Sequence, residues 1–509
     1  MSQWDPLAVV DEDPGEDRGR HSRDVGQSAR RGVMATSVGQ AITQLGSMAA
    51  TIILARLLSP SDFGLIAVAQ SIMGAGTLIS LAGLNASLVT RRGAIDSLGT
   101  TYFWLSLSLG AAFAGLMATL AAPVATLVGV PEAAPLVALL AVALPFNLAV
   151  LVPQALLQRQ LAFTRLNIAL VAPAVLYFVS EVVLVLMGWG ARGVIAAQVA
   201  SAVFGTILAL RLARWLPRHG FAPSGIRQDL RVLGGVSATQ VMSYIYKNID
   251  YWMVGRALGT NAVGAYYVAY VLPNIVRLRL TSTYTTIMLP VLSTAETIQE
   301  AKDRWRQATT VMLFISVPLL VGTAAIGEPL VQLFFGPKWS SAIAPMQILV
   351  VGTIIDVLWA AASTMALAQK RMGNYTIAFG VRLIATAAAI VVALTISRSI
   401  AAVAWAVVSG GLLALVVQDR LVGRPLGIGL TTISGAIVRI GSACCLMAIA
   451  IHLTLESVDD LPLWAQVFLG VAIGAAAYLT SSVLISRGFT TLMLRHVRDI
   501  ILSSRAKTL

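Results

Sequence analysis

Residues 56 to 69 read RLLSPSDFGLIAVA, and residues 256 to 269 read RALGTNAVGAYYVA. The two segments lie 200 positions apart, and each joins two long apolar stretches through a short turn. Six apolar stretches intervene, an even number, so both copies have the same orientation if the stretches cross a membrane. The pattern predicts a parallel internal repeat. The coincident pairs are Arg56/Arg256, Leu58/Leu258, Gly64/Gly264, Val68/Val268 and Ala69/Ala269, with Ser37/Ser237 and Gln40/Gln240 upstream and ALLQRQ (155–160) echoed by ALAQKR (366–371) at an offset of 211.

A second interpretation of these turns stays open. An arginine, a turn and a glycine also suit any tight helix hairpin, in which Gly64 and Gly264 simply allow close packing. The composition is less ambiguous, because 57% of the 509 residues are hydrophobic and only 12% are charged. Soluble domains carry about 45–50% apolar and about 25% charged residues. We therefore expect a membrane protein.

Fourteen apolar stretches are long enough to cross a bilayer, since about 20 helical residues span about 30 Å of hydrocarbon. The fold class predicted is all-α: a polytopic membrane protein with 14 transmembrane helices, in two parallel-repeat six-helix lobes plus two C-terminal helices. The predicted spans are 33–57, 62–89, 100–122, 134–157, 167–188, 191–213, 232–255, 262–291, 308–335, 342–368, 374–397, 400–418, 432–454 and 461–486.

Lysine and arginine crowd into every second break between these spans. Of the 36 such residues, 26 fall in the two tails and the alternate breaks, five in the other breaks and five inside spans. Cytoplasmic loops carry such an excess, so both termini are predicted to be cytoplasmic. The predicted units are a disordered tail at 1–32, an amino-terminal lobe at 33–215, a carboxy-terminal lobe at 231–420, the last two helices at 430–486 and a basic tail at 487–509.

Polar side chains form stripes at three- and four-residue spacing on three spans. Such faces line either a packed helix interface or a wet cavity, and two of the stripes carry cations, which favours a cavity. The tyrosines among them offer flat faces suited to sugar rings. The stripes are Ser37, Gln40, Thr43, Gln44, Ser47 and Thr51; Ser237, Gln240, Ser243, Tyr244, Lys247 and Tyr251; and Tyr266, Tyr270, Asn274, Arg277, Thr281 and Tyr284.

Five cations and three acids lie inside the spans, where each costs about 2.5–3.5 kcal/mol on insertion scales. The cationic surplus predicts an anion-binding cavity, with phosphate or pyrophosphate as the ligand. Lys247, Asp250, Arg382 and Arg439 lie nearer span ends, so snorkelling, or a Lys247–Asp250 pair, explains them equally well. The candidate substrate-binding residues are Gln40, Gln44, Lys247, Tyr270, Asn274, Arg277, Arg279 and Arg382, and the candidate coupling or counter-charge residues are Glu181, Asp250 and Asp356.

Other classes of function find little support in the chain. The net charge of +13 is scattered over turns rather than gathered on one surface, so nucleic acid is not an expected partner. The two cysteines, Cys444 and Cys445, are adjacent in an apolar stretch, so neither a metal site nor a cofactor is expected. An enzyme would need carboxylates or histidines on a sizeable loop, whereas the loops are short and basic and the four histidines are isolated.

The segment ARLLSPSDFGLIAVA (55–69) resembles the polysaccharide-transporter branch, Wzx type, of the multidrug/oligosaccharidyl-lipid/polysaccharide flippase superfamily. LLQRQLAFTRL (156–166), NIDYWMVGRALGTNAVGAYYVAYVLP (248–273), MLPVLS (288–293) and FFGPKW (334–339) add to the likeness. It implies alternating access in the bacterial inner membrane and transfer of a polyprenyl-diphosphate-linked oligosaccharide to the periplasmic leaflet. Membrane lipids, a polysaccharide polymerase and glycosyltransferases are the implied partners. A drug or cation antiporter of the same superfamily is the alternative, which the cationic surplus disfavours.

Overall fold

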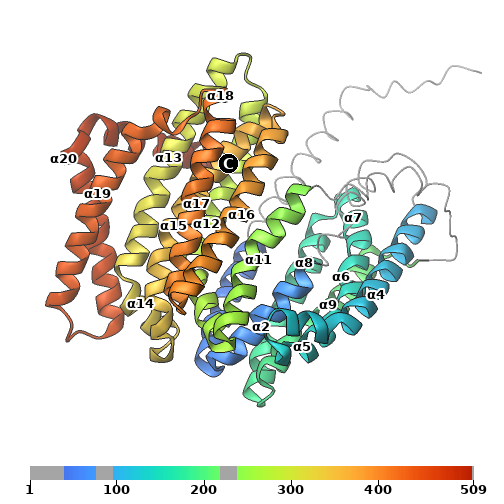
Figure 1. Cartoon of the computed structure of the whole chain (residues 1–509). Helices are drawn as coiled ribbons and strands as arrows, with labels where there is room; N and C mark the ends of the chain where they lie inside the picture. The colour runs from blue at the N-terminus through green and yellow to red at the C-terminus, as the bar shows by residue number, and fades with distance from the viewer. Residues whose placement is uncertain (1–38, 76–95, 218–237, 507–509) are drawn as a thin grey trace, which may run out of the picture.

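The computed structural model describes residues 39–75, 96–217 and 238–506, and within these ranges the chain is helical and forms no strand (Figure 1). Nine of the described helices are long and apolar enough to cross a membrane, and a bent pair makes ten. The protein is therefore a multi-pass membrane protein. The predicted tail at 1–32 and parts of several predicted spans lie outside the described residues.

The amino-terminal half begins with a helix over residues 39–57. Ser59 and Asp62 then form a reciprocal capping box that starts the next helix, α2. Of the following elements, α2 lies at the lower centre of Figure 1 and the others on its right. The elements are α2 (Pro60–Met73), α4 (Asp96–Leu127), the 3-10 turn η2 (Pro131–Ala133), α5 (Ala134–Ala141), α6 (Leu144–Ala149), α7 (Leu151–Arg159), α8 (Phe163–Leu186) and α9 (Gly190–Ala213).

The carboxy-terminal half repeats this order and continues into two further long helices on the left of Figure 1. Gly470 and Gly474 of the last helix pack on Ile326 and Ile451, so this GxxxG motif serves packing within the chain. The elements are α11 (Ala238–Leu258), α12 (Thr260–Ser293), α13 (Ile298–Ala325), α14 (Gly327–Phe334), η4 (Pro337–Ala342), α15 (Ile343–Ala368), α16 (Met372–Ile396), α17 (Ile400–Gln418), the π turn η5 (Asp419–Gly423), α18 (Arg424–Leu426), α19 (Leu430–Ser457) and α20 (Leu463–Ala506), which kinks at Ser486.

Two predicted spans are wrong as continuous helices. The span at 134–157 is divided among α5, α6 and α7 and bends by 44°. Pro145 begins this break because proline has no N–H to continue the helical ladder. The span at 308–335 belongs to a helix that starts earlier, at Ile298, and ends at Ala325, and α14 is a separate helix with Pro329 in its first turn.

The two halves pack together through α2 and α12 at the turns of the internal repeat. A Cβ atom on Gly64 would overlap the backbone carbonyl of Thr260, and one on Gly264 would overlap the carbonyl of Pro60. The hydroxyl oxygens of Ser61 and Thr260 are 3.1 Å apart at the same place. Both glycines are therefore needed for the close approach of the two repeat copies.

The repeat-related arginines each reach into the opposite half. Arg56 donates from Nε to the carbonyl of Phe334, at 3.3 Å, and also from Nη2 to Leu333 at the end of α14. Arg256 donates from Nη1 to the carbonyl of Leu127, at 2.9 Å, at the end of α4. Each guanidinium thus satisfies helix-end carbonyls that lack intrahelical partners.

The loops that follow the helix ends contacted by these arginines also resemble each other. The offset of 200 residues that relates the two turns does not align these loops. Gly129 and Gly336 both have a positive φ, +79° and +98°, and each leads into a proline-started 3-10 turn. On the second loop, Lys338 Nζ donates to the carbonyl of Leu58 at 2.7 Å, and Trp339 Nε1 donates to Ala55 at 2.9 Å. We call these contacts, with Gly64 and Gly264, the lower junction.

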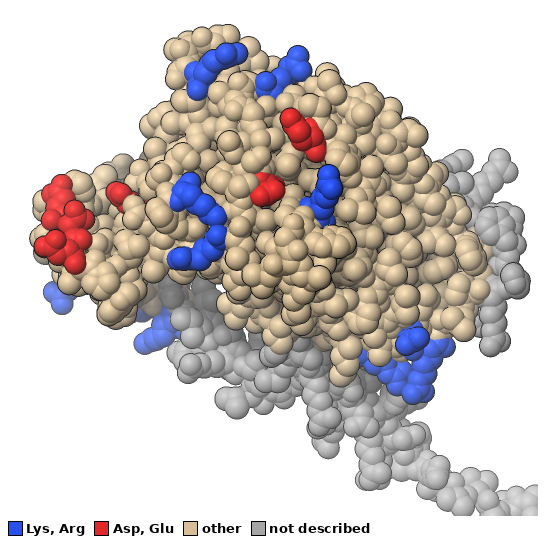
Figure 2. All heavy atoms as spheres, turned by 90° about the horizontal axis from the view of Figure 1, so that it is seen from below, with Lys and Arg blue, Asp and Glu red and all other residues tan. Residues whose placement is uncertain are grey.

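The lower junction lies at the bottom of Figure 1, and Figure 2 shows the molecule from that side. Most of this face is uncharged. Its largest acidic group lies over the turn between α19 and α20, where the exposed acids are Glu456, Asp459 and Asp460.

Candidate functional site

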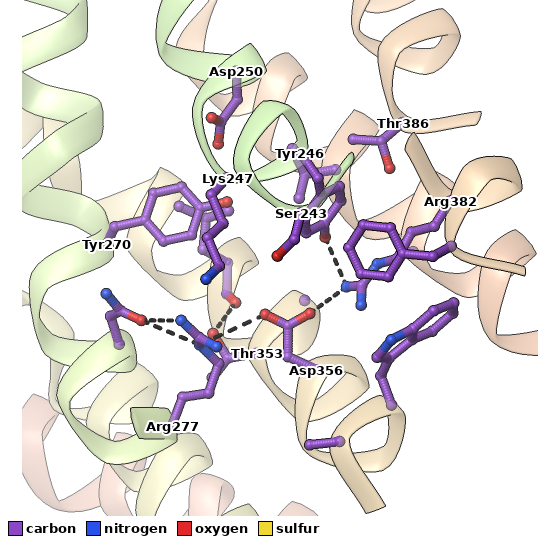
Figure 3. Close-up of a pocket in the computed structure, with 18 of the residues that line it drawn as sticks. Ser243, Tyr246, Lys247, Asp250, Tyr270, Arg277, Thr353, Asp356, Arg382 and Thr386 are labelled. Carbon is purple, nitrogen blue, oxygen red and sulfur yellow. Dashed lines mark hydrogen bonds and ion pairs between the residues drawn. The ribbon is translucent and has the colours of Figure 1, made fainter. Parts of the chain in front are cut away.

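A polar cavity of about 390 Å³ lies inside the carboxy-terminal half (Figure 3). It is lined by residues of α11, α12, α15, α16 and α17, and no described residue of the amino-terminal half lines it. The cavity therefore belongs to a single half, and the predicted polar stripe that includes Gln40 and Gln44 does not contribute to it. The residues singled out from the sequence that line it are Lys247, Asp250, Tyr270, Asn274, Arg277, Asp356 and Arg382.

Helical spacing brings these side chains together. On α11 the lining residues are Ser243, Tyr246, Lys247, Asp250 and Tyr251, at steps of three and four, so they share one face. The opposite face of α11 binds the amino-terminal half, because Trp252 Nε1 donates to Ser71 Oγ of α2 at 3.0 Å and Tyr244 donates to the carbonyl of Ser71. One helix therefore joins the cavity to the other half of the protein.

Asp356 of α15 lies at the centre of the charged cluster. Its Oδ1 accepts a hydrogen bond from Nη2 of Arg382, and its Oδ2 lies 3.7 Å from Nε of Arg277 (Figure 3). Its side chain is 25% exposed. A single carboxylate therefore lies between two guanidinium groups from different helices.

Arg382 is held by an ion pair, a hydrogen bond and two aromatic rings, although its buried Nε has no hydrogen-bond partner among the described residues. Its Nη2 also donates to the hydroxyl of Tyr246 at 2.7 Å, and its guanidinium carbon lies 4.4 Å from the Tyr246 ring centroid and 4.6 Å from that of Trp359. Only 4% of the side chain is exposed. Arg382 does not snorkel, since an aromatic cation–π sandwich and an ion pair hold it in the protein interior.

Arg277 and Lys247 are less constrained. Arg277 is 25% exposed, and its Nε and Nη2 donate to Oδ1 of Asn274 at 3.1 and 2.5 Å. Lys247 is exposed and has no carboxylate within 4.0 Å among the described residues. The suggested Lys247–Asp250 pair is therefore not formed. Asp250 is instead buried, with Oδ1 accepting from the Tyr251 backbone N–H at 2.9 Å.

The remaining predicted residues lie elsewhere. Gln40 and Gln44, on the helix over 39–57, and Arg279, on α12, are exposed and do not line this cavity. Glu181 is buried in α8 of the other half, beside Tyr177. Most of the tyrosines are packed rather than available to sugars: the rings of Tyr251, Tyr266, Tyr267 and Tyr270 contact one another, the Tyr284 hydroxyl bonds Thr309 and that of Tyr244 bonds Ser71.

Sequence reasoning missed the aromatic residues that hold Arg382. Tyr246 precedes a residue of the polar stripe, and Trp359 lies three positions after Asp356, on the same side of α15. This spacing alone indicates that Tyr246 and Trp359 lie close to the predicted charged residues. The partner on α16 was not predictable, because it depends on how three helices pack.

A family model described as "Polysaccharide biosynthesis protein" matches residues 53–344, more than half of the chain. The chain belongs to this polysaccharide biosynthesis protein family. This confirms the resemblance inferred from residues 55–69 and 248–273. The match includes both repeat turns and the lower junction.

Curated relatives and solved structures agree with the family. The chain is 28% identical over 296 residues to the succinoglycan biosynthesis transport protein ExoT of Rhizobium meliloti (strain 1021), covering 57% of this chain and 59% of that protein. It is 25% identical over 317 residues to the lipopolysaccharide biosynthesis protein WzxC of Escherichia coli (strain K12), covering 60% and 63%. The matches therefore span about three fifths of the length of these relatives.

The fold is that of a solved flippase. The inward closed conformation of lipid II flippase MurJ superposes with a TM-score of 0.73 at 13% identity, over 89% of this chain and 99% of that one. An inward-facing multidrug resistance MATE family transporter superposes with a TM-score of 0.59 at 17% identity, over 78% and 99%. At these identities the likeness concerns the fold.

Proposed function

We propose that the protein is a flippase that moves a polyprenyl-diphosphate-linked oligosaccharide from the cytoplasmic to the periplasmic leaflet of the bacterial inner membrane. The observation that carries the proposal is the cavity of the carboxy-terminal half, which Lys247 and Arg277 line. Among the described residues, Lys247 has no carboxylate within 4.0 Å, and Arg277 has only the weak contact with Asp356 at 3.7 Å. The family supports it, since its curated relatives are named for polysaccharide biosynthesis and transport.

The cations lower the barrier to burying a charged headgroup. A diphosphate in hydrocarbon loses its hydration, and guanidinium and ammonium groups inside a protein cavity replace part of it. The polyprenyl tail stays in the lipid while the headgroup occupies the cavity, so no covalent bond needs to form or break. A drug or cation antiporter would instead need a surplus of acids around its site. The cavity lining has three cations, Lys247, Arg277 and Arg382, against two acids, Asp250 and Asp356.

The proposed topology has fourteen spans in two six-helix lobes, with both tails in the cytoplasm. The helix over 39–57 then runs outward, so Arg56, Gly64 and the lower junction lie on the periplasmic side. In this arrangement the conformation described is closed toward the periplasm, and substrate reaches the site from the cytoplasm. Release requires that the lower junction separate, and α11 supplies a connection between the cavity and α2.

The test compares two arginines on one helix. Arg277→Ala is expected to abolish export of surface polysaccharide while membrane insertion stays normal. Arg279→Ala is the matched control, because Arg279 lies two residues away and does not line the cavity. Normal export by the Arg277 variant, or equal loss in both variants, would count against the proposed site.

A further inference from the structure

The two ion pairs of Asp356 differ in strength. Arg382 is 4% exposed, and its contacts to the Tyr246 hydroxyl and to two aromatic rings fix it in place. Arg277 is 25% exposed, and its Nε lies at the longer distance of 3.7 Å from the carboxylate. Partly exposed pairs at such distances are weak, whereas a buried hydrogen-bonded pair is costly to break.

Because its ion pair with Asp356 is the weaker of the two, Arg277 can exchange the carboxylate for another anion. If Arg277 moves away, Asp356 keeps Arg382 and does not become an unpaired charge in the interior. If Arg382 moved away, it would leave its aromatic sandwich and the Tyr246 hydroxyl as well. Asn274 Oδ1 accepts from both Nε and Nη2 of Arg277 and so holds the guanidinium beside Asp356 in the structure.

Two cations are then available to a ligand. Once Arg382 has neutralised Asp356, the cations left in the lining are Lys247 and Arg277, one for each phosphate of a diphosphate, and the acid left is the buried Asp250. A carboxylate oxygen and a phosphate oxygen offer a guanidinium the same kind of forked acceptor. In the structure the carboxylate of Asp356 lies opposite Arg277, with its Oδ2 3.7 Å from Nε.

We propose, as a deepening of the proposed function, that Asp356 is an internal stand-in for the substrate's phosphate and sets the affinity of the site. The incoming diphosphate displaces the carboxylate from Arg277, and the carboxylate recaptures Arg277 when the headgroup leaves. A flippase needs such competition, because a headgroup that binds too tightly is not released at the other leaflet.

The test measures binding of inorganic pyrophosphate to the purified full-length protein by calorimetry. Asp356→Asn keeps the shape of the side chain and an acceptor for Arg382 but loses the competing charge. The loss of a partly exposed pair predicts roughly fivefold tighter pyrophosphate binding. Flipping of the lipid-linked substrate by this variant is expected to slow, because release becomes harder.

Asp303→Asn is the control. It removes the same formal charge from an exposed residue of α13 that pairs with Arg306 and does not line the cavity. It is expected to change pyrophosphate affinity by less than about twofold. Equal tightening in both variants would mean a general electrostatic effect and would overturn the proposal.

The remaining outcomes separate this proposal from the proposed function. If wild-type protein binds pyrophosphate and Asp356→Asn binds it equally or more weakly, Asp356 is not a competitor, although anion capture stands. If the wild-type protein does not bind pyrophosphate, anion capture itself fails. Asp356→Glu keeps the charge and is expected to bind no tighter than wild type, so tighter binding by it would overturn the proposal even if Asp356→Asn did not fold.

Discussion

Gly64 and Gly264, 200 residues apart in the chain, lie against each other where α2 and α12 meet, and a Cβ on either would come within about 3.2 Å of the other's backbone nitrogen as well as overlapping a carbonyl. The two residues occupy the same place in the two copies of the repeat. Each glycine therefore allows the backbone of the other turn to approach closely.

Gly64→Ala is expected to destabilise the protein by about 1–3 kcal/mol, because the added methyl group overlaps the backbone carbonyl of Thr260. A thermal unfolding curve of the purified protein measures this as a lower midpoint. Gly115→Ala on α4 is the control, since nothing lies within 4 Å of the position of its Cβ. An unchanged midpoint in the Gly64 variant would contradict the close packing.

A disulfide across the lower junction is expected to stop transport. The Ser61 and Thr260 hydroxyls are 3.1 Å apart, so cysteines at both positions are placed to form a bond. In a background with Cys444→Ser and Cys445→Ser, oxidation of Ser61→Cys/Thr260→Cys should block export and reduction should restore it. Each single cysteine variant serves as a control. Full export by the oxidised pair would show that the junction need not open.

Tyr246→Phe is expected to lower stability by about 1.5 kcal/mol, because the hydroxyl that accepts from the charged Arg382 is lost while the ring face remains. Tyr375→Phe is the comparison, since that hydroxyl accepts from a neutral donor, Trp359 Nε1, at 3.3 Å. A larger loss in the Tyr375 variant would argue against a special role for the Arg382 cluster.

Pyrophosphate affinity should fall as salt is raised. The two cations that face the cavity, Lys247 and Arg277, are partly accessible to water, so added ions screen their attraction for the ligand. Titrations at low and physiological ionic strength measure the change. Affinity that does not vary with salt would indicate binding through neutral contacts.

The repeat, the helical class and several cavity residues were accessible from sequence because each left a local signal. Arg56 and Arg256 share an offset of 200, and Lys247 and Arg277 each lie on a polar stripe. The contacts that Arg56 and Arg256 make with the opposite half leave no local signal in the sequence. The correspondence of Gly129 and Gly336 was not recognised, because their offset differs from the 200 residues that relate the turns. Pro145 is a local signal for the break in the span at 134–157, but the residues around it are continuously hydrophobic, so the segment was predicted as one helix.

The reciprocal reach of Arg56 and Arg256 has the pattern of an isologous interface, in which one surface patch meets its own counterpart. A single polypeptide here carries contacts of the kind that two copies of one subunit make about a two-fold axis. Because the two copies are joined in one chain they need not be identical, and the cavity lined by Lys247, Arg277 and Asp356 is formed by residues of the carboxy-terminal copy.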